Sequence, residues 1–169
     1  MIAQDGNMIR KLEKSRDYAW EGEADFPLFG EVVRVFIYDE NDLEYAQKCV
    51  EELHRLPLPV IEKLCEFSIA YCEDFREYFE DEDIPIPEGI QSREILKYIQ
   101  PSSLIIKSPS DERIAIHLEL DCDWEPEHGM EWIVLDGEVL YVGSFHGENP
   151  WRGREYFADE GKSYVMFPD

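Results

Sequence analysis

The chain has few cysteines and no long apolar run. Its four cysteines form no CxxC pair and have apolar neighbours, which predicts small buried thiols rather than disulfides or thiolate-bound zinc. Free thiols are typical of a reducing cytoplasm. No run approaches the roughly 18 apolar residues of a transmembrane helix, and the N-terminus lacks the apolar region of a secretory signal. We therefore expect a cytoplasmic protein that does not enter the membrane.

Positive charge is also scarce. The 169 residues hold 16 Lys and Arg against 39 Asp and Glu, which gives a formal net charge of -23. The negative electrostatic potential of such a chain repels nucleic acid and anionic membrane surfaces, so we expect neither as a partner. It raises the rate of association with a basic protein and concentrates divalent cations. The plainer interpretation of the charge is solubility alone.

Catalytic signatures are missing as well. The sequence has no HExxH, no Gly-x-Ser-x-Gly, no phosphate-cradling glycine loop and no Cys–His signature. An enzyme is therefore the less favoured class, and we expect no cofactor. The length suits a single domain over residues 1–169. Residues 1–16 are expected to form a short docking helix or a mobile arm, and the aromatic extension 146–169 is expected to pack over a sheet.

Hydrophobic periodicity predicts an α+β fold. Residues 18–25 alternate and residues 31–38 are rich in β-branched and aromatic side chains, which indicates an N-terminal hairpin. Helical spacing over 43–53 and 61–79 predicts two helices, paired as an antiparallel hairpin, and 92–99 predicts a short third helix. Residues 101–111 are interpreted as a connector. Residues 114–122, 130–135 and 138–145 predict a three-stranded meander with a two-residue Asp136-Gly137 turn. The expected architecture is a mainly antiparallel sheet covered by an inserted helical hairpin.

Acidic and aromatic residues crowd the turn between the first two strands of that meander, residues 120–132. Trp124 and Trp132 can bury a large area at the end of the sheet, and Gly129 allows a positive φ, so the turn has an architectural interpretation. A rigid, acidic tip with exposed aromatic rings is also a plausible recognition surface. The candidate binding residues in this turn are Asp123, Trp124, Glu125, Glu127, His128 and Glu131.

A second acidic segment spans residues 73–88, where Arg76 is the single basic residue. Negative charge at the C-terminal end of a helix is unfavourable with the helix dipole. This cost favours an interaction role over a merely solvated face. Asp81, Glu82 and Asp83 are therefore added to the candidate binding residues.

A divalent cation is the main alternative ligand. His117, Glu119 and Asp121 alternate onto one face of a predicted strand, and Asp123 continues the same parity. Such a ladder of oxygen ligands suits a hard cation, although its spacing does not match an EF-hand loop. The plainer interpretation is a hydrated acidic strand edge. A metal-dependent hydrolase built on residues 121–131 is the catalytic version of this alternative.

The turn sequence Asp123-Trp-Glu-Pro-Glu-His-Gly129, between two strands, resembles a bacterial family of uncharacterised domains with a D-W-x-x-E-H-G signature. The likeness covers most of residues 18–145 and departs at Met130 and Trp132. Similar small acidic bacterial proteins are suspected of being immunity or partner-binding proteins. The resemblance therefore implies an immunity-like or partner-binding protein. Together with the net charge and the missing catalytic signatures, this leads us to expect a non-enzymatic protein that binds a basic protein partner.

Overall fold

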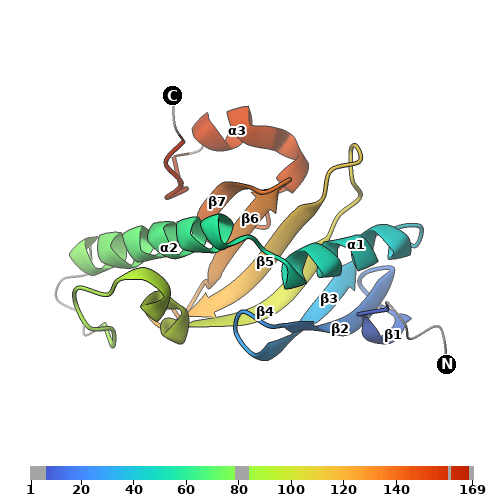
Figure 1. The fold of residues 1–169 in the computed structure, drawn as a ribbon, viewed down its shortest axis with the longest axis horizontal. Helices are drawn as coiled ribbons and strands as arrows, with labels where there is room; N and C mark the ends of the chain where they lie inside the picture. Colours follow the sequence, from blue (N-terminus) through green and yellow to red (C-terminus); the bar gives the residue numbers. More distant parts are fainter. Residues whose placement is uncertain (1–6, 79–83, 160, 168–169) are drawn as a thin grey trace.

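The computed structural model describes residues 7–78, 84–159 and 161–167. Its strands form one seven-stranded sheet in which the spatial order follows the chain order (Figure 1). All neighbouring strands are antiparallel except β3 and β4, which are parallel. The predicted α+β class with a mainly antiparallel sheet is confirmed. The strands are β1 (Arg10–Lys14), β2 (Trp20–Phe26), β3 (Glu31–Ile37), β4 (Ile99–Ile106), β5 (Ala115–Cys122), β6 (Met130–Leu135) and β7 (Glu138–Ser144).

The crossover between the parallel strands β3 and β4 carries α1 (Leu43–His54), α2 (Leu58–Tyr78) and the 3₁₀-helix η2 (Ser92–Tyr98). Parallel neighbours need such a crossover, and here it covers one face of the sheet. Figure 1 shows α1 and α2 following one another across that face instead of lying as the expected antiparallel hairpin. The sheet is wide enough for α1 to pack on β2 and β5 while α2 packs on β7. Among the described residues, no helix is long and apolar enough to cross a membrane.

The main core lies between these helices and the sheet. It is built from side chains that alternate along the strands and recur at helical spacing, such as Val35 of β3, Leu118 of β5 and Leu64 of α2. The four cysteines are all buried and free, as predicted. Burial raises the pKa of the Cys49 thiol to about 12 and that of Cys65 to about 11, so both thiols stay protonated.

The N-terminal segment forms a strand, and the expected docking helix or mobile arm is wrong over residues 10–14. β1 pairs antiparallel with β2, and Ile9 is buried beside Gly22, where an added Cβ would come within 2.9 Å of Ile9 Cγ2. β1 has five exposed residues, a shift in its register and a positive φ of 54° at Lys11. Periodicity could not reveal this strand because so short and irregular a segment has no buried face.

The expected connector at residues 101–111 is also wrong, because β4 runs from Ile99 to Ile106 in the middle of the sheet. Pro101 lies next to a register irregularity between β4 and β5, where a missing N–H donor is tolerated. Residues 103–106 are buried throughout. A strand covered on both faces shows no alternation, and this short apolar run was therefore not recognised.

The second face of the sheet is covered over β5, β6 and β7 by η3 (Pro150–Arg152) and α3 (Gly153–Asp159). Phe157 of α3 is 1% exposed and packs with Ile133, Leu135 and Tyr141 in a second, smaller core. The aromatic tail thus packs on the sheet, as its composition indicated. The interpretation of His117, Glu119 and Asp121 as a hydrated strand edge is wrong at His117, which is buried because the chain after β7 lies against this part of the sheet.

Candidate functional site

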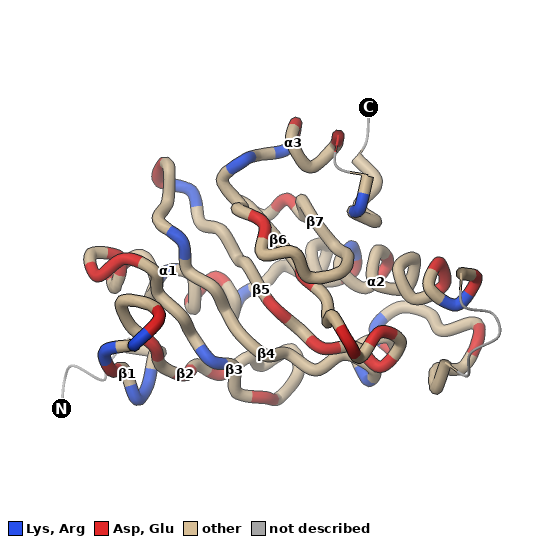
Figure 2. Tube along the Cα trace, turned by 180° about the vertical axis from the view of Figure 1, so that it is seen from behind, with Lys and Arg blue, Asp and Glu red and all other residues tan. Residues whose placement is uncertain are grey.

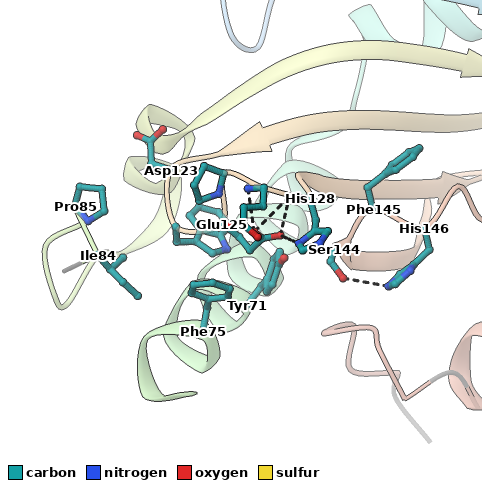
Figure 3. A pocket seen from close by; sticks show the side chains of 13 residues that line it. Tyr71, Phe75, Ile84, Pro85, Asp123, Glu125, His128, Ser144, Phe145 and His146 are labelled. Atoms are coloured by element: carbon teal, nitrogen blue, oxygen red, sulfur yellow. Dashed lines mark hydrogen bonds and ion pairs between the residues drawn. The ribbon is translucent and has the colours of Figure 1, made fainter. Parts of the chain in front are cut away.

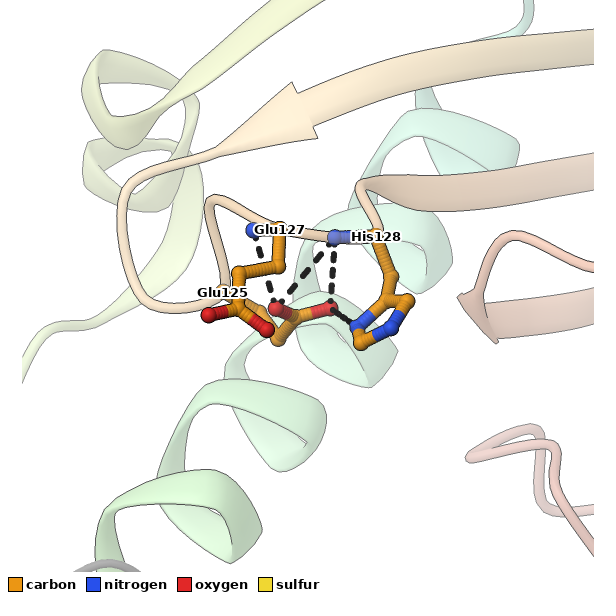
Figure 4. A group of neighbouring side chains, drawn as sticks. All are labelled: Glu125, Glu127 and His128. Carbon is orange, nitrogen blue, oxygen red and sulfur yellow. Dashed lines mark hydrogen bonds and ion pairs between the residues drawn. The ribbon is translucent and has the colours of Figure 1, made fainter.

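The β5–β6 turn is ordered from within by the carboxylate of Glu125. This carboxylate accepts hydrogen bonds from the backbone N–H groups of Glu127 and His128, at 3.1 Å each, and is 2.9 Å from His128 Nδ1 (Figure 4). Gly129 has a φ of 72°, and an added Cβ would come within 2.8 Å of the Leu120 carbonyl oxygen. Glu125 was expected at the surface, but its side chain is only 9% exposed. It acts as an internal acceptor that fixes the turn.

Trp124 anchors the turn to α2. Its side chain is buried and meets the ring of Tyr71 edge-on, with the centroids 5.6 Å apart. Trp132 is buried as well, and its Nε1 donates to Ser68 Oγ at 3.0 Å. The exposed aromatic rings expected at this tip are therefore absent from these two positions. The large apolar area of both indoles is used in the core, so Trp124 offers no free ring face to a partner.

A cavity of about 920 Å³ opens beside the turn (Figure 3). Its walls come from the end of α2, from residues 84–85, from the turn and from residues 144–146. Three carboxylates and two imidazoles line it, and no Lys or Arg does among the described residues. The lining residues are Tyr71, Phe75, Ile84, Pro85, Asp123, Trp124, Glu125, Pro126, Glu127, His128, Ser144, Phe145 and His146. The cavity thus combines an anionic rim with apolar and aromatic walls.

The charge of this cavity is not neutralised from within. Asp123 and Glu127 are exposed, and neither forms a hydrogen bond or ion pair through its carboxylate with another described residue. Figure 2 shows the same region from behind as a stretch of Asp and Glu at the end of β5. The His128 side chain is 71% exposed at the rim. The carboxylates of Asp123 and Glu127 are therefore each available to a cationic group of a partner.

The candidate metal ligands are assembled differently from the predicted ladder. Glu125, Glu127 and His128 each offer one ligand atom, and these atoms lie within 4.8 Å of one another (Figure 4). Among the described residues, His117, Glu119, Asp121 and Asp123 do not form such a group. The chain turns after Cys122, which ends the parity of the strand, and the ring of His117 is buried against another side chain.

That other side chain is Glu131, which was expected at the surface and is fully buried. His117 Nε2 is hydrogen-bonded to Glu131 Oε2, and the two side chains are 1% and 0% exposed. Glu131 also accepts bonds from the backbone N–H groups of His146 and Glu148, at 3.1 and 3.0 Å. Glu131 therefore holds residues 146–148 on the sheet, and His146 is also the last residue of the cavity wall formed by residues 144–146.

Two further ionisable groups lie near this buried pair. Burial lowers the pKa of Lys107, against the opposing effect of Glu131 and Glu148. Its ammonium donates to the carbonyl oxygens of Gly147 and Glu148, at 3.1 and 3.3 Å. Burial raises the pKa of the Glu119 carboxyl, and the negative charges of Asp121 and Glu131 add to the rise. Segment 146–148 is thus held by two side chains: the Glu131 carboxylate accepts from its N–H groups, and the Lys107 ammonium donates to its carbonyl oxygens.

A family model described as a domain of unknown function, DUF6985, matches residues 8–150. The chain belongs to this family. This match confirms the prediction that the chain belongs to an uncharacterised family. No curated protein and no solved structure matches the chain. The DUF6985 match spans all seven strands, α1, α2 and the β5–β6 turn, so nearly the whole cavity wall lies within the family domain.

The predicted second acidic segment, residues 73–88, lies within the DUF6985 domain, and residues 79–83 of it are outside the described part of the chain. Asp81, Glu82 and Asp83 lie outside the described residues. The sequence had not placed Tyr71, Phe75, Phe145 or His146 at the site. The helical pattern assigned Tyr71 and Phe75 to α2, but no local pattern could bring the end of α2 to a turn almost 50 residues later.

Proposed function

We propose that this protein is a non-enzymatic, immunity-like binding protein that holds a basic protein partner at the cavity beside the β5–β6 turn. The observation that carries the proposal is the composition of the cavity wall: Asp123, Glu125 and Glu127 line it, with no described Lys or Arg. Glu125 is used within the turn, which leaves Asp123 and Glu127 for the partner. The net charge of -23 would speed the encounter with a basic surface.

The buried pair of His117 and Glu131 supports a binding role over catalysis. His117 and Glu131 could act as an acid and a base by their chemistry, but both are buried beneath residues 146–148. A general base must come within hydrogen-bond reach of the proton that it removes. Solvent and substrate do not reach this pair, so we assign it to holding the fold.

The proposal predicts that partner capture depends on the cavity and not on net charge alone. The double variant Asp123→Asn/Glu127→Gln should weaken capture of the basic partner at least about tenfold, since bonds to charged groups contribute roughly 1.5–3 kcal/mol each. Proteins retained from an extract of the source cells would be identified by mass spectrometry. The dissociation constant of each purified basic candidate would then be measured at low and high salt.

The matched control is Asp17→Asn/Glu112→Gln. It removes the same two charges from exposed positions near the opposite end of the sheet. This control should change the dissociation constant less than about twofold, because surface charges away from the contact act weakly. Equal losses in the two double variants, or capture that salt does not weaken, would contradict the proposal.

Cation binding at Glu125, Glu127 and His128 is a second candidate function, favoured by the closeness of their ligand atoms. Calorimetric titration with calcium, magnesium, manganese and zinc tests it. A functional site requires saturable binding that Glu127→Gln removes and that Asp121→Asn, an exposed carboxylate outside the group, leaves intact. Absence of saturable heat with all four ions would eliminate this candidate.

A further inference from the structure

We infer that the cavity receives an arginine side chain of the partner, with its guanidinium group at the carboxylate of Glu127. This inference rests on the proposed function and names the group that is recognised. The exposed carboxylate at the rim, the aromatic walls and the volume of the cavity all favour this occupant.

The carboxylates favour a planar donor with several N–H groups. Asp123 and Glu127 are both exposed at the rim, while Glu125 is held in place by the turn amides and by His128. Arginine presents five N–H donors in a rigid fork and can bond a carboxylate through two of them at once. Lysine has a compact, strongly hydrated ammonium group, which lacks this planar fork of donors.

The aromatic walls favour the same side chain. Phe75 from α2 and Phe145 after β7 are both partly buried and line the cavity, and Figure 3 shows them on different sides of Glu125 and His128. A guanidinium group stacks on an aromatic face, and its methylene stem packs on apolar surface. Ile84 and Pro85 supply further apolar surface to the lining. The cavity therefore offers both carboxylate oxygens and apolar surface to an occupant.

The volume fits a residue presented on a loop. The cavity measures about 920 Å³, near the upper end of the roughly 300–1,000 Å³ of ordinary ligand pockets. One arginine side chain does not fill such a space, so the residues beside it in the partner would enter as well. The occupant is therefore an arginine-bearing loop or terminus of the basic protein.

Three capped pentapeptides test the inference: Gly-Gly-Xaa-Gly-Gly with arginine, lysine or the uncharged isostere citrulline at the centre. Each would be titrated into the ¹⁵N-labelled full chain in the presence of a chelator, and the backbone amides of Glu127 and His128 would be followed by NMR. The arginine peptide should bind about tenfold more tightly than the lysine peptide. The citrulline peptide should not saturate.

Two variants separate this inference from the broader proposal. Phe75→Leu should weaken the arginine peptide about threefold to tenfold but leave the lysine peptide within twofold, because stacking is lost and charge is kept. Glu112→Gln should change neither. Equal affinity of the arginine and lysine peptides, or no effect of Phe75→Leu, would overturn the arginine assignment. The proposed function is tested separately from the arginine assignment. If the peptides overturned that assignment while capture of the basic protein still depended on Asp123 and Glu127, the proposed function would stand.

Discussion

Trp124→Ala is expected to lower the free energy of unfolding by about 3–5 kcal/mol, as is typical when a large aromatic side chain is removed from a core. Trp124 is 2% exposed and packs edge-on against Tyr71, whose other neighbour, Tyr164, stacks on it at 4.9 Å. Its loss would leave a cavity between the β5–β6 turn and α2. Urea denaturation followed by circular dichroism measures this change.

Phenylalanine substitutions at Trp124 and Trp132 provide a matched comparison for this prediction. Among the described residues, Trp124 Nε1 has no hydrogen-bond partner, whereas Trp132 Nε1 donates to the buried hydroxyl of Ser68. Trp132→Phe would leave that hydroxyl without its donor, which costs about 1–3 kcal/mol beyond the change in packing. Trp124→Phe carries no such cost and should be the milder substitution. The reverse order would contradict the packing described for the turn.

Glu131→Ala is expected to cost about 3–5 kcal/mol as well, because removal of one partner from a buried pair leaves the other without compensation. The substitution would remove the acceptor of His117 Nε2 and of the backbone N–H groups of His146 and Glu148. Denaturation measures the global effect. Hydrogen exchange at residues 146–148 should in addition become faster, because this segment loses its anchor on the sheet.

Glu119→Gln is the matched control for this prediction. Glu119 lies opposite Glu131 in the β5–β6 register, and burial raises the pKa of its carboxyl. A raised pKa means that folding disfavours the ionised form, so this group lowers stability as the pH rises through its folded-state pKa. Neutralising it should therefore increase stability at pH 7, whereas Glu131→Ala should decrease it. Destabilisation of similar size in both variants would mean that Glu131 has no special anchoring role.

Both Trp124 and Glu131 support walls of the cavity from within the fold. Trp124 anchors the turn that bears Asp123 and Glu127, and Glu131 holds residues 146–148, which begin with His146 of the cavity wall. Variants that keep the global fold but loosen either support should weaken partner binding through misplacement of the cavity wall. The exposed residues at the rim, in contrast, can be changed at little cost in stability.

Local signals in the sequence were sufficient for much of the fold. Asp136 and Gly137 adopt the positive φ values of 50° and 80° that a two-residue hairpin turn demands. Ala46, Val50 and Leu53 lie on the buried side of α1, as their spacing predicted. Such features were predictable because the residues that produce them are neighbours along the chain or lie within two turns of a helix. β1 and β4 were missed because one has no buried face and the other is buried on both.

The sequence by itself determined the α+β class, most of the helices and strands, the free buried thiols and the acidic turn. Only the tertiary structure decided which acidic residues remain available to a partner. Glu125 and Glu131 look like Asp123 and Glu127 in the sequence, yet the first two are buried acceptors and the last two are exposed at the rim of the cavity. The physical reason is that burial depends on contacts between distant segments: α2 packs beneath the turn, and residues 146–148 close over β5 and β6.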